Sequence, residues 1–600
     1  MIYLIYLIAL SLHIFCNEPQ SINTVKSLAT QQKLHTKKTW RQLIGIYSKH
    51  KFHNKSDIKS PSFFLSSEGH TNPKSELLAT IDGYYSSISK DENMHPKCQF
   101  PARYLWLKKY LNLDAYPSEM PNCSNYKKWT DINQIYSVQL MFVDGYLSNP
   151  ASFHGHLLLK FNTKNATLLN TTTNYGAIIA NDNPIIYIIK GVFGGYDATY
   201  TDQQFYRYNH NYSNIEQRDI WAYTLNLNNE QRQFLAAHNW ELLGKKFSYY
   251  FFRDNCAYRI GRLLELVMPD PVVPQNIPWT LPSQIIQNTT KSPNNVKEID
   301  YIPSRETKFT QAYNMLSKGS KQVFHKIQSE QNFEHFANGT LNTKEKRSLL
   351  DAFIDYNQLQ FSKTNHNLPY FNNILLTRLK LPASDESQLY DASSIHKFQN
   401  PGLIQPAITF TNNRPFTSLR LRASNYDILS ADLGREPNNI MEMGDIKIKS
   451  NHDFITLDYL TLIQVFAINT PKNKLEKNAF AWKIHIGINK DPLSKQNVFF
   501  TTLGFGKSHN FQTLTMYGLL SVQIQSGQHS IIWQPTMGAI ASFTPQIKTH
   551  ASFIYHFHQS KSAPVLNIDT RYLISKNRDI QIKFKQSDNT QIEIGHGIYW

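Results

Sequence analysis

The stretch GKKFSYYFFRDNCAYRIGRLLELV, residues 244 to 267, joins an aromatic run to a polar step, a cysteine and an amphipathic segment. Apolar residues recur after the cysteine at the spacing of one helical face. They are Ile260, Leu263, Leu264 and Val267. Asp254 and Asn255 precede the segment, and both residue types are favoured at helix N-caps. The sequence therefore predicts a helix whose first turn contains Cys256.

Cys256 has the surroundings of a nucleophile. Unpaired N–H groups and the helix dipole at a helix N-terminus favour negative charge, so they favour the thiolate, which is the reactive form. A carboxylate of Asp254 turned toward the sulfur would oppose this effect. We expect Asp254 to turn back onto its own backbone as a cap. The alternative for Cys256 is a buried structural cysteine, and a partner histidine would favour the catalytic interpretation.

A predicted strand upstream, HGHLLLKF at residues 154 to 161, contains two histidines. One face has Leu157, Leu159 and Phe161, which can contribute to a core. The other face has His154, His156, Leu158 and Lys160. A histidine on that face can reach a cysteine that arrives later in the chain at a helix N-terminus. The combination indicates Cys–His catalysis.

The composition is that of a folded, multidomain protein with a basic surplus. Its 600 residues suffice for roughly three or four domains, and 41% of them are hydrophobic. A net charge of +17 suits nucleic acid or an anionic membrane surface, but the lysines are scattered without a basic block. We therefore expect no nucleic-acid partner.

The N-terminus has the features of an export signal. MIYLIYLIALSLHIF is an uninterrupted apolar run, too short to span a bilayer comfortably, and polar residues follow it. We expect a signal peptide over residues 1 to 17. Cys16 suggests a lipoprotein, but Phe15 is larger than the small residue that such a cleavage site requires. Export without a lipid anchor is the prediction.

The remaining cysteines divide into a pair and a single residue. Cys98 and Cys123 lie in one segment, and such a pair in an exported protein predicts a disulfide. Cys256 is then left as a free thiol.

Residue patterns divide the soluble part of the chain into three. Residues 39 to 135 show short helical patterns and are expected to form a helical domain stapled by the disulfide. Residues 136 to 300 change to β-rich runs followed by helical stretches, which indicates an α+β unit. Residues 301 to 395 return to helical spacing and predict a helical hairpin region without recognisable chemistry.

Residues 396 to 600 are β throughout. Alternating segments of about ten residues, separated by polar turns, number on the order of twelve, an even count as in single-chain bacterial barrels. The chain ends in HGIYW, with an aromatic terminal residue as in outer-membrane barrels. We predict an antiparallel transmembrane β-barrel of about 12 strands. A soluble β-sandwich is the alternative, because its strands also alternate.

Five motifs in order between about 140 and 270 resemble a known family: PASFHGHLLLKF, TNYGA, GVFGGY, RDIWAY and YYFFRDNCAYRI. The family is the Lnb N-terminal periplasmic domain, a bacterial domain of unknown function named after a lipoprotein transacylase. Proteins of this kind often have a helical domain in front, similar to the pattern at 40 to 123 here. The family histidine belongs to a Phe-Gly-His step, in which His154 replaces the Phe. The resemblance therefore assigns the histidine to His156 and the cysteine to Cys256.

The order of histidine before cysteine implies a circularly permuted papain-like fold, to which lecithin retinol acyltransferase is similar. The resemblance implies thiol acyl transfer or amide hydrolysis. In such folds a polar group on the next strand orients the histidine. The resemblance implies this role for Asn174, which directly precedes Tyr175 in the TNYGA motif.

The complete interpretation is a multidomain α+β protein of the outer membrane, whose barrel anchors a papain-like Cys/His domain in the periplasm. Cys256 would attack an acyl or amide carbonyl, His156 would take and return the proton, and Asn174 would orient the imidazole. The expected substrate is a cell-envelope lipoprotein or peptidoglycan peptide, and outer-membrane lipid surrounds the barrel. This mechanism requires no cofactor.

Three alternatives stay open at the level of the sequence. A zinc site is one, with the candidate ligands His154, His156, Asp254 and Cys256. A transport or adhesion barrel with a non-catalytic periplasmic domain is the second. The third is an amidase on cell-wall peptide in place of an acyltransferase on lipoproteins.

Overall fold

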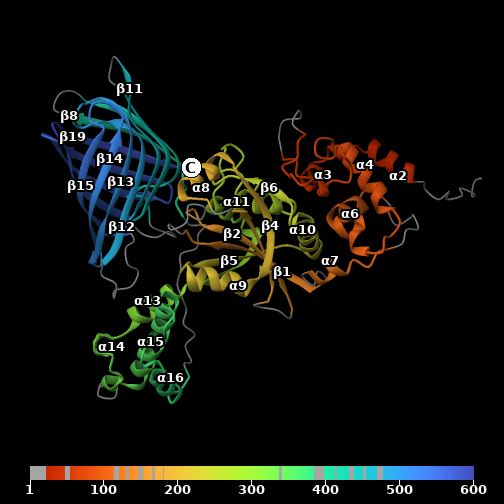
Figure 1. Cartoon of the computed structure of the whole chain (residues 1–600), viewed down its shortest axis with the longest axis horizontal. Helices are drawn as coiled ribbons and strands as arrows, with labels where there is room; N and C mark the ends of the chain where they lie inside the picture. Colours follow the sequence, from red (N-terminus) through yellow and green to blue (C-terminus); the bar gives the residue numbers. More distant parts are fainter. Residues whose placement is uncertain are drawn as a thin grey trace, which may run out of the picture. The chain divides into compact units, whose positions relative to one another are not determined.

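The protein is described from a computed structural model in which the chain forms two compact units (Figure 1). The first unit comprises Met1–Val143, His154–Asn211 and Trp221–Asp300, and the second comprises Asp144–Phe153, Tyr212–Ile220 and Tyr301–Trp600. The structure describes residues 22–47, 54–111, 113, 120–129, 134–145, 153–164, 169–179, 182–336, 341–383, 398–411, 415–431, 438–450, 454–468, 478–511 and 513–600. The predicted signal peptide lies outside these residues, and the domain boundaries within each unit stay predictions.

The first part of unit 1 is helical. Its α-helices are α2 (Ile22–Gln31), α3 (Lys38–Leu43), α4 (Pro73–Tyr84), α5 (Pro96–Gln99), α6 (Pro101–Lys108) and α7 (Ser124–Trp129). Three of them begin with proline, whose fixed φ suits the first turn and whose missing N–H would have had no helical partner there. The predicted disulfide between Cys98 and Cys123 is present, and it joins α5 to the start of α7.

The second part of unit 1 is built on a seven-stranded sheet with the order β6-β4-β3-β2-β1-β5-β7. The strands are β1 (Ile135–Val143), β2 (His156–Thr163), β3 (Thr171–Ala177), β4 (Tyr196–Gln204), β5 (Ile220–Leu225), β6 (Lys246–Tyr249) and β7 (Val296–Ile302). Strands β1 to β4 pair antiparallel, each with the next along the chain. Helices α8 (Pro184–Phe193) and α9 (Phe205–Asn209) lie in the connections on either side of β4.

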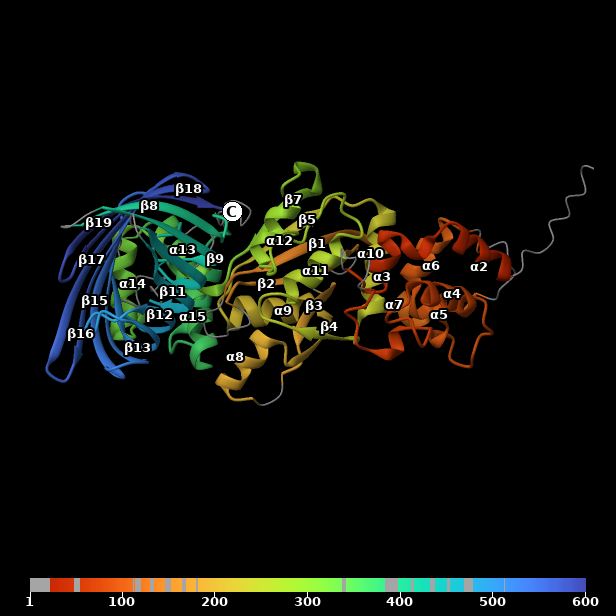
Figure 2. The same cartoon turned by 90° about the horizontal axis from the view of Figure 1, so that it is seen from above.

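Three helices pack against the centre of this sheet and set the position of the cysteine. They are α10 (Asn229–Leu242), α11 (Cys256–Leu264) and α12 (Pro282–Thr289). Helix α11 contacts β2 and β3, and α12 contacts both α11 and β1 (Figure 2). A buried carboxylate joins the sheet region to the helical part, because Glu241 of α10 accepts the N–H groups of Ala102 and Arg103 at the start of α6. A carboxylate at a helix N-terminus is favoured by the helix dipole.

The segment predicted as a helical hairpin contains four α-helices within the described residues. They are α13 (Arg305–Met315), α14 (Lys318–Glu330), α15 (Thr343–Thr364) and α16 (Phe371–Leu379). Helices α13 and α14 are separate because the Ser317 side chain caps α14 directly after α13 ends. Phe324 and Phe353 stack with ring centroids 4.1 Å apart at the centre of the helical core. None of the described helices combines the length and the apolar content that crossing a membrane requires.

The C-terminal part of unit 2 is a closed antiparallel barrel of twelve strands, as predicted. The strands are β8 (Leu403–Thr411), β9 (Phe416–Tyr426), β10 (Ile440–Ser450), β11 (Ile455–Ala467), β12 (Asn478–Lys490), β13 (Asn497–Phe511), β14 (Leu514–Gln525), β15 (Ile531–Ser542), β16 (Ile547–His558), β17 (Lys561–Ser575), β18 (Arg578–Gln586) and β19 (Thr590–Tyr599). The last strand closes the barrel, because β19 pairs with both β18 and β8. Trp600 and Gly402 extend this closure by exchanging two backbone hydrogen bonds.

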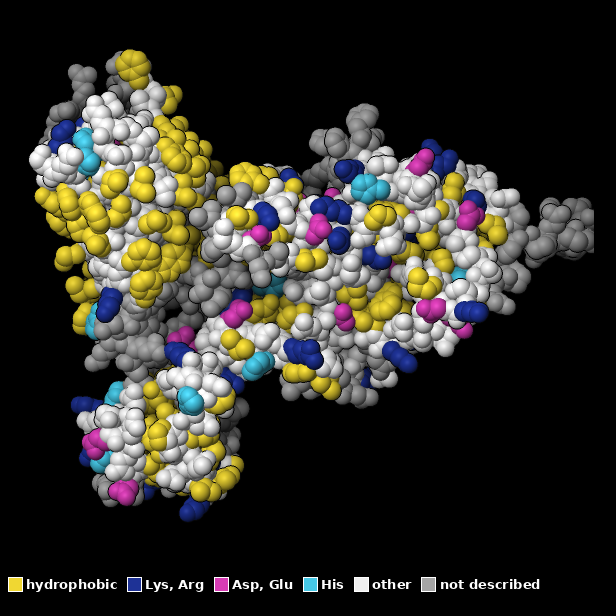
Figure 3. Space-filling view, in the orientation of Figure 1, with side chains coloured by type: hydrophobic (Ala, Val, Ile, Leu, Met, Phe, Trp, Pro, Cys, Tyr) yellow, Lys and Arg dark blue, Asp and Glu magenta, His cyan; other side chains and the backbone are white. Residues whose placement is uncertain are grey.

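The barrel has an apolar exterior and a polar interior. In β19, the side chains of Ile592, Ile594 and Ile598 are exposed, whereas Glu593 and Tyr599, which point to the other face, are buried. The same alternation recurs in β13 and β14, and apolar side chains cover much of the visible face of the barrel (Figure 3). Outward apolar residues that alternate with polar interior residues are the pattern of an outer-membrane barrel, and they exclude the soluble β-sandwich.

Charged side chains form a network inside the barrel. Arg420 of β9 donates to Asp445 at 2.9 Å and to Glu442 at 2.6 Å, both of which lie on β10. Lys447 of β10 contacts Glu593 of β19, although these two strands are not neighbours in the barrel. The second contact therefore spans part of the lumen.

The residues directly after β9, 427–431, are buried at the end of the barrel where β8 begins. Ile428 and Leu429 are buried in one apolar cluster with Ile440, Phe466, Ile468, Ala481, Tyr517, Leu519 and Ile540. The connections 427–439 and 468–477 at this end are longer than any at the opposite end, where 491–496 is the longest. Bacterial outer-membrane barrels usually have short periplasmic turns and long outer loops. In this barrel the longer connections lie on the periplasmic side.

Candidate active site

Cys256 is the first residue of α11, as predicted, and its side chain is 3% exposed. The helix start is held by Asn255, whose Oδ1 accepts the N–H of Tyr258 at 3.1 Å. The Asn255 amide also donates to the carbonyl oxygens of Phe251 at 3.0 Å and Thr280 at 2.8 Å. Asn255 therefore fixes the loop before the cysteine and has no donor left for a substrate.

His156 is the first residue of β2, directly after a glycine that the backbone requires. Gly155 has φ +86°, and a Cβ there would lie 2.7 Å from the ring of Phe142 and from the carbonyl oxygen of Val143. Only glycine combines this conformation with this close approach. Gly155 thus allows the chain to turn into β2, and His156 then lies at the start of the strand that α11 contacts.

Asn174 lies beside His156 on the neighbouring strand β3. Its Oδ1 is 2.5 Å from Nε2 of the imidazole. Because an amide oxygen only accepts, Nε2 carries the hydrogen, and Nδ1 is left to interact with the thiol. The structure therefore brings together all three side chains named from the sequence, although their catalytic role stays a proposal.

Opposing effects act on the thiol of Cys256, and the net result is a lowered pKa. Burial alone raises the pKa of this thiol. The charge of the His156 ring and its hydrogen bond to the sulfur lower the pKa, and so do the backbone N–H groups of Leu157 and Ala257. The lowering effects prevail, so the site stabilises the thiolate in spite of its burial.

Asp254 does not cap its own backbone, and this expectation was wrong. Its Oδ2 accepts from Nε of Arg253 at 2.9 Å, and its Oδ1 lies 3.8 Å from Nη2 of Arg259. The reason is that Asn255 already occupies the cap position, while two guanidinium groups offer stronger, charge-assisted partners. These ion pairs balance the carboxylate charge near the sulfur.

Arg259 is a structural residue of the site that sequence reasoning missed. Its buried guanidinium pairs with Asp57 at 2.9 Å, and the two residues are 202 positions apart in the chain. The same guanidinium lies 4.6 Å from the ring centre of Phe247. No local pattern could reveal this pairing, because only folding brings the Asp57 segment to α11.

The zinc alternative finds no support in the geometry. His154 precedes β2, and its ring packs edge-on against Phe252 with centroids 5.7 Å apart. Asp254 is engaged by arginines. Across the described ranges, no group of three or more His, Cys, Asp or Glu side chains is arranged to hold a metal ion.

Fold and site together define a class of protein: an outer-membrane β-barrel joined to a periplasmic domain with a Cys/His site. Residues 125–289 match the family model of the Lnb N-terminal periplasmic domain. Residues 32–110 match the Domain of unknown function (DUF7843), and residues 402–599 match the Domain of unknown function (DUF7840). No curated protein matches the chain.

The chain is also similar to several solved structures. The KdgM porin is 11% identical, with 33% of this chain and 99% of that chain covered and a TM-score of 0.23. Omp33 of Acinetobacter baumannii is 11% identical, with 34% and 100% covered and a TM-score of 0.20. An outer membrane channel from Pseudomonas putida F1 is 9% identical, with 36% and 99% covered and a TM-score of 0.23.

Proposed function

We propose that the protein is a cysteine acyltransferase or hydrolase that acts on a cell-envelope substrate through an acyl-enzyme. The observation that carries the proposal is the chain of contacts from the Cys256 thiol to His156 and from His156 to Asn174. A thiolate held by an imidazole, which is itself oriented by an amide oxygen, is the arrangement that activated cysteine nucleophiles require.

The reaction follows from the position of each group. The Cys256 sulfur attacks the carbonyl carbon and forms a C–S bond, while the carbonyl π electrons move to oxygen. When the tetrahedral intermediate collapses, the bond to the leaving amine or alcohol breaks, and the imidazolium of His156 gives its proton to that group. Water or an acceptor amine then attacks the thioester carbonyl carbon, and the C–S bond breaks as the acid or amide product leaves. His156 takes a proton from this second nucleophile and returns it to the sulfur.

The outer-membrane barrel favours a substrate of the periplasmic membrane surface over a freely diffusing one. Two substrates fit this location, namely the acyl group of a lipoprotein and an amide of peptidoglycan peptide. A transport function is less well supported, because side chains of the chain itself occupy the barrel mouth and cross part of the lumen.

The test is to incubate the full-length protein in detergent micelles with lipoprotein and, separately, with peptidoglycan, and to measure products by mass. We expect a product from one of them and an acyl adduct on Cys256 in a quenched reaction. Cys256→Ser should abolish turnover with the fold unchanged, since serine is nearly isosteric but far harder to ionise.

Two results would contradict the proposal. One is full function of Cys256→Ser in cells, which would favour a barrel with a non-catalytic periplasmic domain. The other is turnover that survives in Cys256→Ser but is lost on chelation, which would favour a metal-dependent hydrolase.

A further inference from the structure

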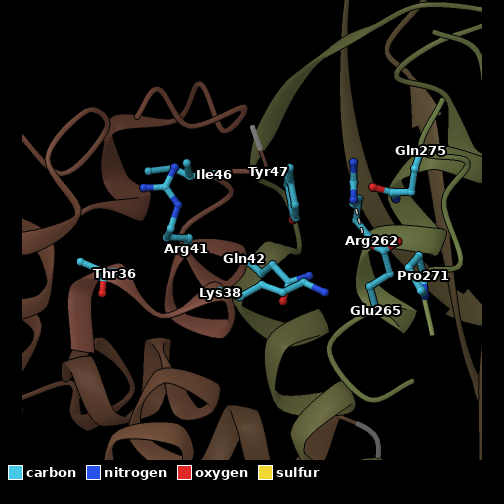
Figure 4. A pocket seen from close by; sticks show the side chains of 10 residues that line it. All are labelled: Thr36, Lys38, Arg41, Gln42, Ile46, Tyr47, Arg262, Glu265, Pro271 and Gln275. Carbon is cyan, nitrogen blue, oxygen red and sulfur yellow. Dashed lines mark hydrogen bonds and ion pairs between the residues drawn. The ribbon is translucent and has the colours of Figure 1, made fainter. Parts of the chain in front are cut away.

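A polar pocket of about 370 Å³ lies in unit 1 between α3 and the second half of α11 (Figure 4). Arg262, which lines it, is six residues after Cys256 on the same helix, or about 9 Å along the helix axis. The pocket is therefore separate from the cysteine site. In Figure 4, Lys38 and Gln42 extend from the α3 side toward the wall that Arg262 and Glu265 form.

The pocket has a surplus of positive charge. Three cations, Lys38, Arg41 and Arg262, line it together with one carboxylate, that of Glu265. This carboxylate is already satisfied, because it accepts from Arg262 at 2.7 Å and from two backbone N–H groups at 3.0 and 3.1 Å. Arg41 donates to the neutral amide of Asn54 at 2.7 Å. Lys38 has no ion-pair partner in the part of the chain that the structure describes.

A buried donor in the wall indicates that an acceptor belongs in the pocket. Gln42 is 5% exposed, and its Nε2 has no hydrogen-bond partner among the described residues. A buried amide donor without an acceptor costs about 1–3 kcal/mol, so proteins rarely leave one. Nε of Arg262 is in the same situation. Burial also raises the pKa of Tyr47, which keeps its hydroxyl protonated as a further donor.

Two aromatic rings hold the Arg262 guanidinium in the wall of the pocket. The Arg262 guanidinium lies 5.2 Å from the ring centre of Tyr47 and 4.8 Å from that of Tyr258, and this stacking holds its plane. The Lys38 ammonium adds a charge from the opposite side. Donors from five side chains exceed the roughly four lone-pair positions of a carboxylate, whereas the three or more oxygens of a phosphate can accept them all.

We infer that this pocket is a binding site for a phosphate group, contacted by Lys38, Arg41, Gln42 and Arg262. The phosphate belongs either to a phospholipid headgroup or to a free phosphate ion, and the chemistry of recognition is the same. The inference does not depend on acyl transfer, because Cys256, His156 and Asn174 are not among the residues that line the pocket.

The experiment uses the full-length protein in detergent micelles and phosphate-free buffer, with calorimetric titration of inorganic phosphate, glycerol phosphate and acetate. We expect both phosphates to bind, acetate to bind at least fivefold more weakly, and affinity to fall as salt increases. Tighter binding of glycerol phosphate than of inorganic phosphate would identify a lipid headgroup as the source. Equal or weaker binding of glycerol phosphate would identify the free ion.

The variants separate a binding site from a merely basic surface. Lys38→Gln and Arg41→Gln should each weaken phosphate binding at least fivefold, and neither removes an ion pair between described residues. Lys55→Gln is the matched control, because this exposed lysine of the same region does not line the pocket. Thermal unfolding of each variant checks that the fold is retained.

Gln42→Met supplies a second, independent readout. Methionine keeps the volume and removes the buried donor, so the ligand-free protein should gain stability while phosphate binding weakens. The inference is overturned if the wild type does not bind phosphate, or if Lys38→Gln and Arg41→Gln bind it as tightly as the wild type does.

Discussion

At the scale of single residues, the surroundings of Cys256 have opposite effects on the pKa of its thiol. Burial disfavours the thiolate, and the adjacent His156 together with two backbone N–H groups outweighs this penalty. Asn255 takes no part in charge stabilisation, because its side chain is committed to three backbone groups of the loop and helix start. Asn255 thus positions the cysteine, whereas His156 favours its ionisation.

The pH dependence of Cys256 alkylation tests this balance. A free cysteine has a pKa of about 8.5. Because the pKa of Cys256 is lowered, the wild type should react with iodoacetamide at a pH well below that value. His156→Ala removes the largest of the effects that lower the Cys256 pKa, while burial still raises this pKa. The alkylation profile should therefore move to higher pH. The alkylation rate is measured by mass spectrometry from about pH 5 to about pH 10, which extends to both sides of the ordinary cysteine pKa.

His154→Ala is the control for the alkylation experiment, since His154 precedes β2 and packs against Phe252. This variant should leave the profile close to that of the wild type. A wild-type profile that rises only near the ordinary value, and that His156→Ala does not change, would identify Cys256 as a structural cysteine.

At the scale of elements, the helical part of unit 1 depends on cross-links between distant segments. The disulfide joins residues 25 positions apart. A buried ion pair between Arg103 of α6 and Glu76 of α4, with both side chains fully buried, adds a polar link within the same part. Such short helices bury too little surface to be stable alone, and tertiary links compensate for this.

Removing the disulfide should therefore destabilise this part of the chain measurably. The double variant Cys98→Ser, Cys123→Ser should lower the free energy of unfolding by about 3 kcal/mol, because the unfolded chain regains the entropy of a loop of this length. Urea denaturation followed by tryptophan fluorescence measures the change. A variant with unchanged stability would show that the ion pairs and helix contacts suffice without the cross-link.

Ile428 and Leu429, directly after β9, are buried in an apolar cluster at one end of the barrel, and we expect this cluster to narrow the lumen there. Replacing both residues by Ser removes their apolar contacts with the cluster. In planar lipid bilayers, we expect little ion conductance from the wild type and frequent openings from this double variant. Leu493→Ser, in the connection at the opposite end, is the control. A wild-type protein that conducts as a steady open pore would show that the cluster does not close the lumen.

At the scale of the whole molecule, the barrel needs every strand. In lipid, unpaired backbone groups have no water to bond, so only a closed sheet is stable there. Strand β19 pairs with β18 on one side and β8 on the other. The C-terminal strand is thus the element that converts an open sheet into a barrel.

Deleting residues 591 to 600 should abolish normal membrane insertion, because the deletion removes almost all of β19. The folded wild-type protein should resist SDS without heating and should shift in gel mobility after boiling. The truncated protein should lose this heat-dependent shift. If it still folds and partitions into membranes as the wild type does, the assignment of 396 to 600 as a membrane barrel is wrong.

Features with a short-range pattern could be predicted from the sequence. The helix that begins at Cys256 follows from an N-cap residue and apolar spacing, and the barrel strands follow from alternation that repeats along each segment. The disulfide follows from export and the grouping of the cysteines. The pairing of His156 with Asn174 came from a family resemblance, since two residues on different strands share no local pattern.

Tertiary structure alone decided which partners the charged and polar side chains found. Asp254 was expected to bond its own backbone, yet the fold places two arginines beside it, and ion pairs to guanidinium groups are stronger. Asp57 reaches Arg259, Ile428 joins an apolar cluster with Tyr517, and Gln42 faces a pocket with Arg262. All three contacts join residues far apart in the chain. Periodicity determines which face of an element is apolar, whereas the contacts of a long polar side chain depend on what packing brings within its reach.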